Sequence, residues 1–65
     1  MELLTFISFF ESYTHLVIHD AFSNYVVCGG SASSLSCRSI LKKKNYVALS
    51  CQVLDNVIHI YVVPN

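Results

Sequence analysis

Charged residues are scarce in this sequence. Only 12% of its 65 residues are Asp, Glu, Lys or Arg, and their formal net charge is zero. This balance excludes a global basic field of the kind that attracts nucleic acid, so any such contact must be local. Hydrophobic residues make up 54% of the chain, which is high for a free monomer of this size. A chain this short buries only about 60% of its unfolded surface. We therefore expect one domain, residues 1–65, that gains stability by self-association or by binding a partner.

Cysteines are too few, and odd in number, for a disulfide framework: the chain has Cys28, Cys37 and Cys51. The apolar run 3–10 is too short to span a bilayer. Glu2 precedes this run where a signal peptide would carry basic residues. We expect an intracellular protein, cytoplasmic or nuclear and not secreted, with reduced thiols and no membrane contact.

Motifs that carry catalysis or bind a cofactor are also missing. The four carboxylates lie singly at expected turns or ends, and the pair of glycines is not followed by the Lys-Ser/Thr of a phosphate-binding loop. His15 and His19 have the spacing of a zinc pair, but Cys28 and Cys37 would both have to complete the site, and no C-x2-C is present. We predict no catalytic residue, no metal and no cofactor, with the histidines half-exposed on a strand.

The segment 46–64 predicts a β-hairpin with Asp55-Asn56 as its two-residue turn. That turn sets the register, from Leu54 opposite Val57 to Leu49 opposite Val62. One face is then wholly apolar, with Leu49, Cys51, Val53, Ile58, Ile60 and Val62. A two-stranded hairpin is marginal alone, so this face requires a covering layer.

Residues 2–11 allow two interpretations. Leu3, Phe6, Ile7 and Phe10 have helical spacing, whereas the β-propensity of Phe, Ile and Thr favours a strand. We favour the helix, and expect it to cover the apolar face of the hairpin.

A second hairpin is expected over 15–28. Leu16 and Ile18 alternate with polar neighbours, DAFSN forms the loop, and Gly29-Gly30 ends the second strand. The serine-rich segment 31–44 is either a short helix capped by Ser31, with Cys37, Ile40 and Leu41 on one side, or a long loop with a basic end.

The segment 16–27, LVIHDAFSNYVV, resembles the first sequence motif of the Sm and Sm-like RNA-binding proteins. Leu16, the His19-Asp20 step, Phe22, Asn24 and Val27 stand at the family's spacing. The closing hairpin, VLDNVIHIYVV, is similar to the second motif, with Val53-Leu54 in place of its Arg-Gly.

The resemblance implies a mainly β fold: a small, strongly bent five-stranded barrel with a possible N-terminal helix. It also implies assembly with itself or homologous subunits through edge strands, as a closed ring without exposed edges. The alternative is an α+β chain of two hairpins plus helices.

The resemblance also implies an RNA site. Phe22 would stack on a uracil, Asn24 would read the edge of the base, and Asp20 would orient Asn24. Lys42, Lys43 and Lys44 could contact phosphates. The family's pocket-closing Arg has no equivalent here. The other interpretation of DAFSN is an ordinary hairpin loop in which Asp20 and Asn24 bond their own backbone.

These observations predict a non-catalytic subunit of a ribonucleoprotein ring that holds uridine-rich single-stranded RNA. The alternative is a small viral or phage accessory protein that adds its edge strand to a partner protein. A chain without selection for any defined activity is the third alternative.

Overall fold

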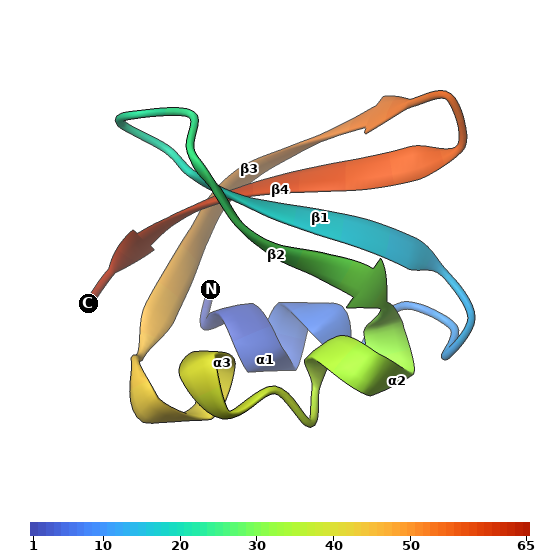
Figure 1. The fold of residues 1–65 in the computed structure, drawn as a ribbon, viewed down its shortest axis with the longest axis horizontal. Helices are drawn as coiled ribbons and strands as arrows, with labels where there is room; N and C mark the ends of the chain where they lie inside the picture. Colours follow the sequence, from blue (N-terminus) through green and yellow to red (C-terminus); the bar gives the residue numbers. More distant parts are fainter.

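The computed structural model describes all 65 residues as one four-stranded sheet with short helices packed against one face (Figure 1). The elements follow in the order α1 (Leu3–Ile7), β1 (His15–Asp20), β2 (Val26–Ser31), α2 (Ala32–Leu35), α3 (Ser39–Lys43), β3 (Tyr46–Leu54) and β4 (Val57–Pro64). Strands hold more residues than helices, so the mainly β class is confirmed. No helix is long and apolar enough to cross a membrane.

Both expected hairpins are present, and they lie side by side in the order β2-β1-β4-β3. Each hairpin is antiparallel, whereas the central strands β1 and β4 run parallel, with Leu16 opposite Ile58 and Ile18 opposite Ile60. This parallel pairing joins two locally formed hairpins into one sheet.

The five-stranded barrel implied by the Sm-like resemblance is not the fold of this chain. There are four strands, and they form an open sheet. Residues 3–7 are helical and so supply no fifth strand. The result is closer to the alternative of two hairpins plus helices, with one sheet face covered and the other open.

The turn of the β3–β4 hairpin was correctly predicted. Asp55 and Asn56 both have positive φ, 51° and 64°, as a type I′ turn requires. The expected pairs hold from Leu54–Val57 to Ser50–Tyr61. The last expected pair is wrong, because the register shifts at Leu49 and Ala48 lies opposite Val62 instead.

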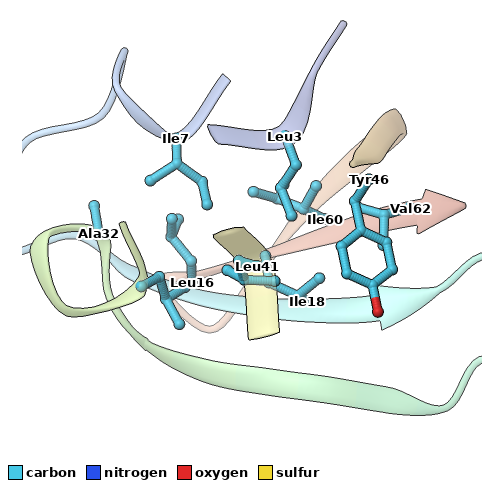
Figure 2. Close-up of a cluster of buried hydrophobic side chains, with 10 residues drawn as sticks. Leu3, Ile7, Leu16, Ile18, Ala32, Leu41, Tyr46, Ile60 and Val62 are labelled. Atoms are coloured by element: carbon cyan, nitrogen blue, oxygen red, sulfur yellow. The ribbon is translucent and has the colours of Figure 1, made fainter. Parts of the chain in front are cut away.

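The core lies between the sheet and the helices. Figure 2 shows Leu3 and Ile7 of α1 pointing toward Leu16 and Ile60 of the sheet. The buried set is Leu3, Ile7, Leu16, Ile18, Ala32, Leu35, Leu41, Tyr46, Ile60 and Val62. The predicted helix near the N-terminus is therefore confirmed, although it is shorter than the segment 2–11.

Segment 31–44 forms two short helices rather than one. The Ser31 hydroxyl accepts a hydrogen bond from the Ser34 N–H (3.3 Å), so the predicted cap is present. The prediction that Gly29-Gly30 end the second strand is wrong, because β2 runs through both glycines to Ser31. Gly30 has a φ of 151°, and its lack of a Cβ permits the close approach of the Ser34 hydroxyl. The predicted common side is wrong: Leu41 is buried while Cys37 is exposed, because the chain changes direction between α2 and α3.

The apolar face of the β3–β4 hairpin is only partly covered. Ile60 and Val62 are buried, but Leu49 and Val53 are 58% and 65% exposed. Figure 1 shows the β3–β4 turn extending away from the helices, so the end of the hairpin nearest this turn lies outside the helical layer.

Candidate nucleic-acid interface

The β1–β2 loop, residues 21–25, is held in one shape by Asp20. The Asp20 carboxylate accepts hydrogen bonds from the N–H (2.9 Å) and the hydroxyl (2.8 Å) of Ser23. Main-chain bonds join the Asn24 N–H to the Asp20 carbonyl (2.8 Å) and the Asp20 N–H to the Tyr25 carbonyl (2.7 Å). Asn24 adopts a positive φ of 61°, which Asn tolerates better than most residues. The sequence therefore specifies an ordered loop.

The hydrogen bonds from Ser23 also affect the charge of this loop. The Ser23 backbone N–H first, and its hydroxyl second, hold the pKa of Asp20 below its ordinary value of 3.8. Asp20 is consequently ionised at neutral pH and keeps accepting both bonds. Asp20 is expected to orient Asn24, but its carboxylate binds Ser23 and makes no hydrogen bond to the Asn24 side chain.

The loop presents two aromatic rings to solvent. Phe22 is 86% exposed and Tyr25 is 72% exposed, so neither contributes to the core. Asn24 is exposed too, and its side-chain amide makes no hydrogen bond within the chain. Flat rings and a free amide are the groups that stack on a base and read its edge.

The fold brings this loop together with Lys44. A hollow of about 340 Å³ is lined by residues from the loop, α3 and the strand ends, namely Asp20, Tyr25, Val27, Ile40, Lys44, Tyr46 and Pro64. The β1–β2 loop, α3 and the C-terminus lie at the same end of the molecule in Figure 1. The hollow thus combines the exposed ring of Tyr25, the Lys44 cation, the Asp20 carboxylate and apolar side chains.

The other two lysines expected to contact phosphates are close in sequence to this hollow but do not line it. Lys42 and Lys43 form the last turn of α3 and are exposed. Of the expected residues, the structure therefore brings Asp20 and Lys44 to one hollow, beside the exposed Phe22 and Asn24.

A second polar group lies on the open face of the sheet, and sequence reasoning missed it. Nε2 of His19 and Nδ1 of His59 are 2.8 Å apart, so one nitrogen donates to the other according to the tautomer. Tyr61 stacks on His19 with ring centroids 4.9 Å apart. Nδ1 of His19 is buried without a hydrogen-bond partner. Alternation predicts on which face of its own strand each of these side chains lies. It does not predict that β1 and β4 lie side by side, because the two strands are far apart in the sequence.

The zinc arrangement considered from the sequence is not assembled. His19 lies on the open face, whereas Cys28 lies opposite Ile18 and packs against the core. No group of three or more His, Cys, Asp or Glu side chains is positioned to hold a metal ion.

Comparisons of the chain with protein-family models, with curated proteins and with solved structures found no match.

Proposed function

We propose that this chain is a non-catalytic protein that binds uridine-rich single-stranded RNA at the surface formed by Phe22, Asn24, Tyr25 and Lys44. The main support is the hollow of about 340 Å³ that Tyr25 of the loop and Lys44, just after α3, line together, with Phe22 and Asn24 exposed on the same loop. Its volume is within the usual range for small-ligand sites, roughly 300–1,000 Å³.

Stacking of bases on the aromatic rings would supply favourable binding free energy. Phe22 and Tyr25 project from a loop that Asp20 already fixes, so little conformational entropy is lost when a base stacks on them. Stacking on an aromatic side chain stabilises binding by about 1–3 kcal/mol per base. Two rings on one loop are enough for a short stretch of RNA.

The cation and the amide have different tasks. Lys44 can pair with a phosphate, and Lys42 and Lys43 extend the basic character along α3. Asn24 carries both a donor and an acceptor, the pair of groups needed to read a uracil edge. The preference for uridine rests on the Sm-like resemblance of 16–27, and membership of that family and assembly into a ring remain predictions.

Affinity for labelled oligouridine, measured by fluorescence anisotropy, tests the site. Phe22→Ala and Tyr25→Ala each remove one stacking ring, so we expect each to weaken binding by about tenfold. Lys44→Gln should lower the slope of log affinity against log salt by about 0.7. Asn24→Ala should reduce the preference for oligouridine over oligoadenosine.

Two exposed aromatics outside the site serve as matched controls. Phe9 is 68% exposed and Tyr13 is 77% exposed. Tyr13 lies just before the start of β1, whereas Tyr25 lies beyond the end of that strand. Phe9→Ala and Tyr13→Ala should leave affinity unchanged. Equal affinity in Phe22→Ala, Asn24→Ala and the wild type would remove the RNA assignment.

The edge-strand interaction protein is a second candidate function, supported by β3. This strand is nine residues long, contains no charge, and lies at the edge of the sheet. Exposed edges of this kind bind extended segments of partner proteins. Phe22 and Asn24 play no part in such binding, so the variants above separate the two functions.

A further inference from the structure

The outer edge of β3 is covered over only part of its length. Near its start, Val47 forms a bridge with Glu2, and the Ala48 N–H donates to the carbonyl of Met1 (2.8 Å). Beyond Ala48 no segment of the chain pairs with this edge. Residues 49–54 therefore leave main-chain donors and acceptors free along one side.

This free stretch lacks most of the features that protect an edge strand. It has neither a charged residue nor a proline, and its only bulge is at Leu49, its first residue. The other edge strand, β2, is shorter, contains Gly29 and Gly30, and leads directly into α2. The two edges of the sheet are thus unequal, and β3 is the one open to pairing.

Exposed apolar groups accompany the free edge. Cys51 and Val53 are exposed and lie opposite Ile60 and Ile58 of β4, on the side of the sheet that faces the helices. Leu49, the extra residue of the bulge, is exposed as well. Leu49 and Cys51 line a groove of about 160 Å³, together with Met1, Phe6, Ala48 and Ser50. Side chains that would lose contact with water on pairing therefore lie along the strand that has free hydrogen-bonding groups.

We propose that residues 49–53 of β3 pair antiparallel with the same residues of a second copy of this chain, with a two-fold axis at Cys51. Residues directly opposite each other in an antiparallel pair share a face, so the two residue numbers must add up to an even number. With the two-fold axis at Cys51, the numbers of opposed residues add up to 102. Leu49 then lies opposite Val53, Ser50 opposite Gln52, and Cys51 opposite its own copy. Apolar residues then meet apolar ones, and polar residues meet polar ones.

Neighbouring registers are less complementary. A two-fold axis at Gln52 would place Ser50 opposite Leu54, and an axis at Ser50 would place Gln52 opposite Ala48, whose N–H is already bonded to Met1. The occupant is a second copy because the uncharged stretch is complementary to itself in one register only. Five paired residues and a groove form a small contact, because a standard interface has roughly 20–30 residues on each side. The dimer should therefore form in a concentration-dependent equilibrium.

Sedimentation over a range of concentrations tests the pairing with two matched variants. Val53→Lys introduces a charge opposite Leu49, and we expect it to raise the dimer dissociation constant by about tenfold or more. Val26→Lys places the same charge on the other edge strand, at a valine that is 51% exposed, and should leave the equilibrium unchanged. Monomers at all concentrations, a larger closed oligomer, or equal effects of the two variants would overturn the proposal.

Thiol oxidation tests the register without relying on a variant that affects folding. Opposed residues in an antiparallel pair have Cα atoms roughly 4.5–5.5 Å apart, within the range that a disulfide spans. Diamide accepts the two electrons and two protons released as two Cys51 thiols join. The wild type and Cys37→Ser should give a covalent dimer, and Cys51→Ser should not.

Burial raises the pKa of the Cys28 thiol, so this thiol should react slowly. Crosslinking of Cys51→Ser as fast as the wild type would overturn the two-fold axis at Cys51.

Discussion

At the scale of single residues, Asp20 orders the β1–β2 loop. It ends β1, and its carboxylate holds Ser23, so that Phe22 and Asn24 on either side of Ser23 are left free to face solvent. A side chain that orders a loop from within reduces the entropy lost when the loop binds a ligand. In the RNA site that we propose, Asp20 would be a positioning residue, and the rings of Phe22 and Tyr25 would make the contacts.

The Asp20–Ser23 contact should depend on pH. The pKa of Asp20 is lowered in the folded chain, so its contribution is present above the unfolded value and is lost as pH falls through the folded pKa. We expect the NMR resonance of the Ser23 amide to change with a midpoint below 3.8. Asp20→Asn should abolish this titration while the β1–β2 hairpin stays folded. A midpoint at or above 3.8 would show that Ser23 does not hold the carboxylate.

Residue types in the loop could be predicted, but their partners could not. A short motif places Asp20, Phe22 and Asn24 in one loop, and an apolar ring in a turn is expected to be exposed. That Asp20 bonds Ser23 depends on the backbone path through the loop. That Lys44 lines the same hollow depends on the path of α3, which no local pattern specifies.

At the scale of elements, the hairpins are specified locally. Alternation and the Asp55-Asn56 turn were enough to predict the β3–β4 register over five pairs, from Leu54–Val57 to Ser50–Tyr61. The bulge at Leu49 was not predicted, because no local pattern marks it; it lies next to Val47 and Ala48, which pair with Glu2 and Met1. For 31–44 the sequence left a short helix and a long loop open, because five serines give weak helical signals, and the division into two helices that bury Leu35 and Leu41 was not predicted.

Variants of the turn test this local specification. Asn56 has a φ of 64°, where a residue with Cβ and no polar side chain is strained by roughly 1–2 kcal/mol. Asn56→Ala should therefore lower the free energy of unfolding in urea by about 1 kcal/mol. Asn56→Gly removes the strain and should leave that free energy unchanged or higher. Equal unfolding free energies for the two variants would argue against the type I′ turn.

At the scale of the whole molecule, the decisive feature is the parallel pairing of β1 with β4. It buries Leu16, Ile18, Ile60 and Val62 under the helices, and it brings His19 against His59 on the open face. Only ten residues are buried, and a chain of this length has about 3–10 kcal/mol of stability. This parallel pairing joins segments about 40 residues apart, so periodicity could indicate the strands but not their order. The predicted barrel was wrong at this scale for the same reason.

We propose that single-stranded RNA binds at the end of the molecule that carries the β1–β2 loop and Lys44. The most direct measurement is an NMR titration of the ¹⁵N-labelled chain with a short oligouridine. The proposal predicts fast, saturable shifts at Phe22, Asn24, Tyr25 and Lys44, and none at the β3–β4 turn. An unchanged spectrum, or shifts confined to 49–54 of β3, would contradict it.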